Sequence, residues 1–256
     1  MATSAQPHAG VPDDKRFFLT SALVMTAVMI AGFGLSIVMR RSSFGAPPLV
    51  HAHAFIFFGW VFIYLIQNFL IASDRVALHR ALGWIGAFWV VPMLILGTLV
   101  TLARVQAGTV IFFFTPLQFL VFDPGTLIAF AMLTYAAIAL RRHSDWHRRL
   151  HFCAMALLTG PGLGRLLPMP LLQPYAFEVT FAAQLVFPIA GMIADGRRTG
   201  AIHPAWYWGT GALLLTFVAI ELVTFSPLGL GLYQWATAGH LGASVPPLAF
   251  PAPPAP

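Results

Sequence analysis

The chain has 256 residues, of which 59% are hydrophobic, 14% aromatic and only 9% charged. About a quarter of the residues in a soluble domain are charged, so this composition excludes a conventional water-soluble globule. With about 20 apolar residues per crossing, the length allows roughly six to eight membrane-spanning helices and leaves no room for a folded extramembrane domain.

The formal net charge of +6 comes from arginine, because the only lysine is Lys15. Lys15 precedes the first apolar run, so a retinal protein, which needs a Schiff-base lysine inside its helices, is excluded. The arginines lie in short loops, a distribution typical of membrane proteins, and we expect no nucleic-acid partner. The single cysteine, Cys153, excludes an intramolecular disulfide and an all-cysteine iron–sulfur cluster.

Continuous apolar runs predict an all-α polytopic membrane protein with seven transmembrane helices. Residues 1–16 form an N-terminal segment, and 17–224 form the seven-helix domain. Residues 225–256 form a tail rich in Pro and Gly, which we expect to be disordered or to lie along the membrane interface. The expected spans are 17–39, 49–72, 80–102, 116–140, 147–167, 175–194 and 204–224.

The distribution of basic residues predicts the orientation. Ten Lys and Arg residues fall in the loops on the side of the N-terminus, and four fall on the other side. Because cytoplasmic loops carry the excess of positive charge, we expect a cytoplasmic N-terminus, an outer C-terminus and insertion in the inner membrane, in contact with its lipids.

Two spans carry helix-breaking residues. Asp123-Pro124-Gly125 is expected to interrupt the fourth span, and Gly160-Pro161-Gly162 the fifth. Interrupted helices at membrane depth mark ligand or ion sites in some transporters, whereas the ordinary explanation is a kink whose freed carbonyl groups are satisfied by neighbouring helices.

A repeated basic turn precedes the third and fifth spans. His79-Arg80-Ala-Leu and His147-Arg148-Arg-Leu share the pattern His-Arg-x-Leu, which predicts that spans 2–3 and 4–5 are related hairpins. In one explanation the Arg and His side chains reach lipid phosphates. In the other, His79 and His147 or His151 are the axial ligands of the iron of a b-type haem, and Arg80 and Arg148 neutralise its propionates.

Helical periodicity indicates which way these histidines face. His79 shares a stripe with Gly83 and Gly86, a small-residue face that permits close approach of a helix or a cofactor. His147 and His151 are four residues apart and lie on one face, so they are also a pair that can bind a single metal ion. The local motif supplies no third ligand, so haem is favoured over a bare metal.

A second set of polar residues falls within or beside the apolar runs. Intramembrane polar residues are costly, which makes them functional candidates, although hydrogen-bonded structural roles or contact with water are equally open. We expect a shared polar cavity from His53, Gln67, Asp123, Arg165, Glu178 and Glu221.

The segments Leu78–Gly86, Asp145–Leu150 and Gly164–Pro168 resemble uncharacterised bacterial multi-pass membrane proteins, from about residue 50 to 206. The histidine-containing core is more distantly similar to membrane b-type cytochromes. This resemblance implies a helical membrane protein and at most one haem near the cytoplasmic face, because His53 has no matching histidine on the fourth span.

Three functions remain open from the sequence. The first is a haem-binding electron-transfer or oxidoreductase component with a redox partner. The second is a proton-coupled or small-molecule transporter that uses the polar cavity, and the third is a non-catalytic membrane assembly factor. The sequence contains neither a phosphate-binding Gly-x-x-x-x-Gly-Lys motif nor a hydroxylase histidine box.

Overall fold

A computed structural model describes residues 12–41 and 44–253. The described residues form helices and connecting turns, with no strand. The helices are α1 (Pro12–Val38), α2 (Pro48–Ala72), α3 (Val76–Gln106), α4 (Pro116–Ala139), α5 (Ser144–Leu158), α6 (Gly160–Leu166), α7 (Ala176–Thr199), α8 (Pro204–Thr224) and α9 (Pro227–Thr237), with the short 3-10 helices η1 (Met169–Leu172) and η2 (Leu241–Ser244).

Six helices are long and apolar enough to cross a membrane, namely α1, α2, α3, α4, α7 and α8. The segment expected as the fifth of seven spans, 147–167, is instead divided at Thr159 into α5 and α6. Helix α5 has 15 residues and α6 has seven, so neither is long enough to cross a membrane alone, and the first turns of α5 are polar, with Asp145, Arg148 and Arg149. The all-helical, multi-pass architecture predicted from the sequence is confirmed.

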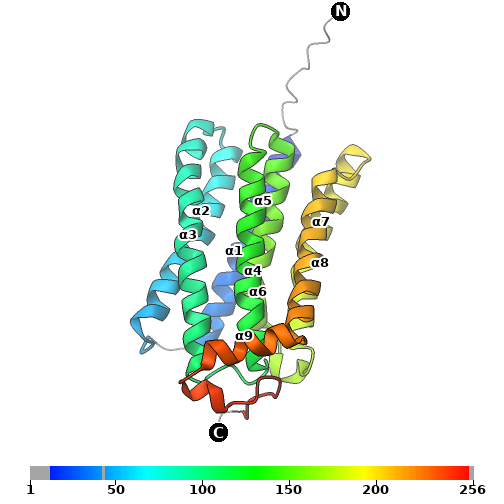
Figure 1. Ribbon diagram of the computed structural model, residues 1–256. Helices are drawn as coiled ribbons and strands as arrows, with labels where there is room; N and C mark the ends of the chain where they lie inside the picture. Colours follow the sequence, from blue (N-terminus) through cyan, green and yellow to red (C-terminus); the bar gives the residue numbers. More distant parts are fainter. Residues whose placement is uncertain (1–11, 42–43, 254–256) are drawn as a thin grey trace, which may run out of the picture.

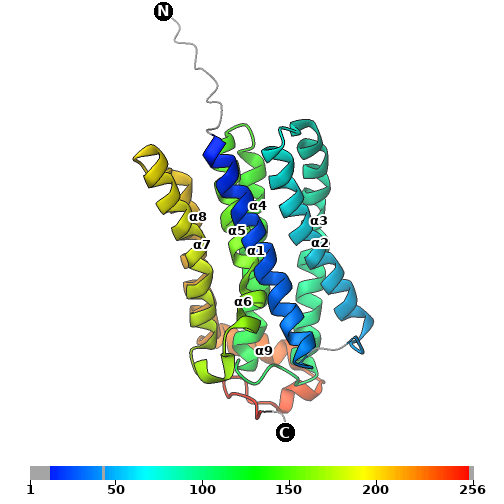
Figure 2. The same ribbon diagram turned by 180° about the vertical axis from the view of Figure 1, so that it is seen from behind.

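The helices stand side by side in one bundle (Figure 1). The antiparallel pairs α2–α3 and α4–α5 pack closely, and α4 joins the two pairs through its contact with α3. Helix α1 crosses the back of the bundle against α2 and α6, as Figure 2 shows, while α7 and α8 pack against α4 and α5. The contacts fit two hairpins, but the prediction that these hairpins are copies of one repeated unit stays a prediction.

Of the two helix interruptions predicted at prolines, the structure contains one. Helix α4 continues through Pro124 without a break, so the predicted interruption at Asp123-Pro124-Gly125 is wrong. A proline inside a membrane helix removes one hydrogen bond, which the surrounding helices compensate. The Gly160-Pro161-Gly162 interruption is confirmed, because the helix breaks at Thr159, directly before Gly160.

Of the two alternatives expected for the tail, disorder is wrong for its described residues, which form a cap with the helices α9 and η2, whereas a position along the membrane interface stays a prediction. Helix α9 runs across one end of the bundle in Figure 1, opposite the α2–α3 and α4–α5 turns, and contacts α3, α4 and α8. Tyr233 Oη donates to the carbonyl oxygens of Gly242 and Val245, at 2.9 and 3.1 Å, and the Leu117 amide donates to Pro247. These bonds tie the tail to the bundle and explain why its Pro and Gly content does not leave it unfolded; residues 254–256 lie outside the described part.

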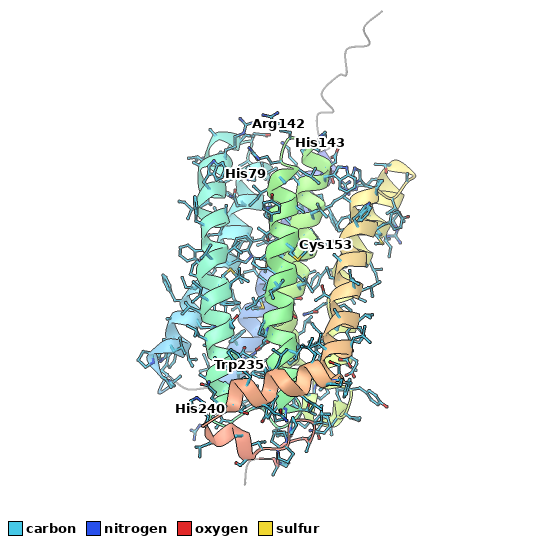
Figure 3. All side chains as sticks on the ribbon, in the orientation of Figure 1. His79, Arg142, His143, Cys153, Trp235 and His240 are labelled. Atoms are coloured by element: carbon cyan, nitrogen blue, oxygen red, sulfur yellow. The ribbon has the colours of Figure 1, made fainter. Side chains whose placement is uncertain are left out.

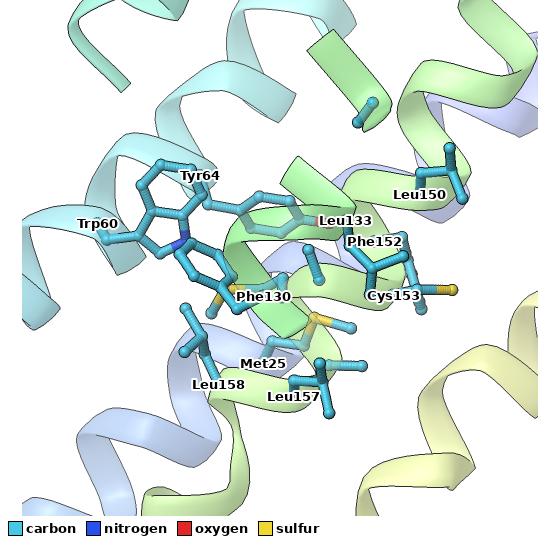
Figure 4. Close-up of a cluster of buried hydrophobic side chains, with 14 of the residues drawn as sticks. Met25, Trp60, Tyr64, Phe130, Leu133, Leu150, Phe152, Cys153, Leu157 and Leu158 are labelled. Atoms are coloured by element: carbon cyan, nitrogen blue, oxygen red, sulfur yellow. The ribbon is translucent and has the colours of Figure 1, made fainter. Parts of the chain in front are cut away.

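The middle of the bundle is filled by apolar and aromatic side chains (Figure 4). Trp60 and Phe130 meet edge to face with ring centroids 5.0 Å apart, and Met25, Tyr64 and Leu133 are buried in the same cluster. On α2 this layer lies between two polar residues, because His53 and Gln67 are 14 residues, or about 21 Å, apart along the helix.

Candidate functional site: a histidine cluster and a second polar group

Three histidine rings meet at the end of the bundle that carries the α2–α3 and α4–α5 turns. The ring centroids of His79 and His147 are 6.1 Å apart, and those of His147 and His151 are 4.8 Å apart, both in edge-to-face arrangements. His79 lies in the first turn of α3, whereas His147 and His151 lie one turn apart on α5. Figure 3 shows His79 near this end, inside the more peripheral Arg142 and His143.

The position of α4 explains why the rings can meet. Helices α3 and α5 both pack against α4, and the imidazoles fill the space between them. Gln67 of α2 lies beside Gly83, one turn after His79, where an added Cβ would be 3.4 Å from Gln67 Nε2. The small residue at position 83 therefore makes room for a polar side chain next to the cluster.

Hydrogen bonding leaves ring nitrogens of this cluster free. His147 Nδ1 is 2.8 Å from the carbonyl oxygen of Ala137. A carbonyl only accepts, so Nδ1 carries the hydrogen, and Nε2 of the neutral ring keeps its lone pair. His79 Nδ1 and Gln67 Oε1 are buried and have no hydrogen-bond partner among the described residues. Buried polar atoms without partners are costly, so these atoms indicate a site for an additional group.

The ring spacing fits coordination of one metal centre. With metal–nitrogen bonds of about 2.0–2.1 Å, two imidazoles whose centroids are 6.1 Å apart are close enough to bind one metal ion. Within residues 12–41 and 44–253, no group of three or more His, Cys, Asp or Glu side chains is arranged to hold a metal ion. Two ligands suffice for haem, because the porphyrin supplies the other four nitrogens.

The two predicted arginines differ in their surroundings. Arg80 is exposed at the rim next to His79. Arg148 faces away from the histidines, and its terminal nitrogens pair with Asp14 of α1 and Asp145 of its own helix. Of the two, Arg80 therefore has no acidic partner among the described residues, whereas Arg148 holds α5 against α1 through Asp14.

The remaining predicted polar residues do not form one cavity. Gln67 lies beside the histidine cluster. Glu221 accepts a hydrogen bond from Gln118 Nε2 at 3.3 Å, and it interacts electrostatically with Glu178 between α7 and α8. His53, Asp123 and Arg165 form a separate group, in which the charge of Arg165 acts on both other residues.

An ionic network that sequence reasoning missed joins α1, α5, α7 and α8. Asp195, 1% exposed, accepts from Arg149 Nε at 2.8 Å, from Trp206 Nε1 at 2.7 Å and from Arg198 at 2.8 Å. Arg198 also pairs with Asp14, at 2.6 Å. Asp195 and Arg198 are three residues apart on one helix, so the sequence alone could indicate their pairing. The contact of Asp195 with Arg149 depends on the packing of α5 against α7, which the sequence does not specify.

No protein-family model, curated protein or solved structure matches the chain. The resemblance to bacterial membrane proteins and b-type cytochromes therefore stays an expectation. The functional inference therefore rests on the geometry of the histidine cluster.

Proposed function

We propose that this chain is a haem-binding electron-transfer protein of the inner membrane. The observation that supports the proposal is the convergence of His79 from α3 with His147 from α5, with ring centroids 6.1 Å apart; these two imidazoles would hold the haem iron. The hydrogen bond from His147 Nδ1 to Ala137 orients that ring and leaves Nε2 as the ligand atom.

The other residues of the site would support the bound group. His151 and Gln67 lie beside the two ligand histidines and would contact the bound group, and Arg80 would pair with a propionate at the rim. A bound haem would supply a one-electron carrier. The chain's own contribution is to fix the two imidazoles, keep the centre in an apolar bundle and set its potential through burial and hydrogen bonds.

The proposed topology has seven crossings. Helix α5 packs against α4, and α6 continues from it against α1 and α7, so α5 and α6 together would be the seventh crossing in addition to the six long helices. The turns at the histidine end would then be cytoplasmic, because they carry most of the arginines. The redox partner would reach the site from the cytoplasm.

The test is an optical one on protein purified in detergent from haem-supplied cells. We expect a reduced-minus-oxidised spectrum with Soret and α bands, and a haem content near one per chain by the pyridine haemochrome method. Both should be lost in His79→Gly and in His147→Gly, and added imidazole should restore part of the signal. A folded, colourless preparation would overturn the proposal.

His143→Ala is the matched control. His143 precedes α5, is exposed and makes no side-chain capping bond, so its removal leaves the cluster intact. Haem content should therefore equal that of the unchanged protein. Equal haem content in His79→Gly, His147→Gly and His143→Ala would show that these histidines are not the ligands.

A further inference from the structure

A second polar site lies toward the opposite, outer end of the bundle. His53 on α2, Thr101 on α3, Asp123 on α4 and Arg165 on α6 come from four different helices. Thr101 is 2% exposed, and His53 Nδ1 is buried without a hydrogen-bond partner. The break before α6 allows Arg165 to approach this group. None of these residues belongs to the histidine cluster of the proposed haem site.

The hydroxyl of Thr101 has two acceptors for one hydrogen. Its Oγ1 is 3.0 Å from Oδ2 of Asp123 and 3.0 Å from the carbonyl oxygen of Gly97. When Asp123 is ionised, the hydroxyl donates to the carboxylate. When Asp123 is protonated, the acid donates to Thr101, which then donates to Gly97. Both protonation states of Asp123 are therefore hydrogen-bonded in one arrangement.

Arg165 provides a nearby positive charge without closing an ion pair. Its guanidinium lies over the ring of Phe33 at 3.9 Å and donates to the carbonyl oxygen of Pro161 at 2.7 Å. No carboxylate of the described chain lies within 4.0 Å of it, yet it attracts Asp123 electrostatically. A direct ion pair would hold Asp123 in the ionised form, whereas a charge at longer range allows the carboxylate to bind and release a proton.

His53 supplies a second proton acceptor, on which the charge of Arg165 acts as it does on Asp123. Its ring stacks on Phe57 with centroids 4.1 Å apart. Three other charged or titratable groups lie on the helices packed against α4 at this end. Arg104 of α3 is exposed. Glu221 of α8 is hydrogen-bonded to Gln118, and Tyr233 of α9 is hydrogen-bonded to backbone carbonyls. Arg165 is thus the charge positioned to control the site.

We propose that Asp123 and His53 form a proton-binding site in the half of the bundle nearer α9, with Thr101 as a two-way hydrogen-bond partner and Arg165 as the internal counter-cation. This site does not depend on the binding of haem. The proton is the ligand, and its uptake and release change the charge of Asp123 while the backbone stays in place.

Infrared spectroscopy of the purified chain tests the proposal directly. We expect a protonated-carboxyl C=O band that shifts in D₂O, is lost in Asp123→Asn and is kept in Glu221→Gln. Thr101→Val should move the frequency of this band, because the acid loses its hydrogen-bond acceptor. If Asp123→Asn does not fold, Asp123→Glu serves instead and should displace the band.

The charge dependence separates a proton site from a merely structural aspartate. In Arg165→Gln the titration midpoint of the band should rise by about one pH unit or more, because the ionised form loses its stabilising cation. Arg104→Gln, at an exposed position on α3, should leave the midpoint nearly unchanged. A carboxylate that stays ionised at every pH at which the chain is folded, or a midpoint that is insensitive to Arg165, would overturn the proposal.

Discussion

Single residues determine how closely α1 approaches α6. A Cβ added at Gly32 would lie 2.3 Å from the carbonyl oxygen of Gly162, and a Cβ at Gly162 would lie 2.9 Å from Met29 Sδ. Backbones that approach this closely are typical of small-residue helix crossings in membranes. The contact holds α6, and with it Arg165, against the bundle.

We therefore expect Gly32→Ala to destabilise the chain by about 1–3 kcal/mol, since the methyl group meets backbone and forces the helices apart. Unfolding in mixed detergent and SDS micelles measures this loss. Gly34→Ala is the matched control on the same helix, because nothing lies within 4 Å of its added Cβ. Equal stability of the two variants would contradict the close approach.

A residue at the start of α8 makes stability depend on pH. His203 Nδ1 accepts a hydrogen bond from the Ala205 amide at 3.1 Å, which caps the helix and requires a neutral ring. Burial, together with the charge of Arg149, lowers the pKa of His203 below its ordinary value of 6.5. The cap therefore contributes fully above that ordinary value, and its contribution is lost as the pH falls toward the lowered pKa of the folded state.

In His203→Asn the cap remains but does not titrate. We expect the unchanged protein to lose more stability than His203→Asn when the pH falls from about 8 to about 5. Thermal unfolding in detergent across this range provides the comparison. Parallel pH profiles for the two proteins would show that the ring does not act as a titrating cap.

At the scale of elements, the orientation of α5 decides whether the histidines can meet α3. One face of α5 carries His147 and His151, and the other carries Arg148 and Arg149, which bind acids on α1, α5 and α7. The ionic network thus fixes the rotation of α5 about its axis. The histidine cluster and the ionic network therefore both depend on the same orientation of α5.

Asp195→Asn should cost about 3–5 kcal/mol, because it leaves the buried guanidinium of Arg149 with only Asp145, at the longer distance of 3.6 Å, as an acidic partner. Asp74→Asn is the control: the pair of Asp74 with Lys15 is exposed, and its loss should cost less than about 1 kcal/mol. The difference between the two variants can be measured by unfolding in SDS-containing micelles. Similar losses would mean that the Asp195 network is not buried from solvent.

The sequence predicts the helices and part of the site for identifiable physical reasons. The length of an apolar run and the spacing of His147 and His151 are local properties, and the repeated turn predicted that His79 would face them. The network around Asp195 and the separation of Glu221 from Asp123 depend on which helices pack together, which local patterns do not specify. The tail helix α9 depends on hydrogen bonds to α3 and α4, which are equally non-local.

At the scale of the whole molecule, the two ends of the bundle differ in charge and in chemistry. The histidine cluster and most of the arginines lie at one end, whereas the Asp123 site and the α9 cap lie toward the other. The aromatic layer around Trp60 and Phe130 lies between them. Electron transfer at one face and proton exchange at the other would be physically separated by this layer.

The proposed orientation predicts which end reacts with a membrane-impermeant maleimide in intact cells. Cys153 is the single cysteine and is fully buried, so Cys153→Ala provides an unreactive background. In that background His240→Cys, at the exposed end near α9, should be labelled from outside, and Arg142→Cys, at the opposite end, only after permeabilisation (Figure 3). In the reversed orientation, ten of the fourteen basic side chains would lie on the outer side, which is against the charge bias of membrane insertion. Labelling of both positions from outside would require an even number of crossings between them and would remove α5 and α6 as a joint span.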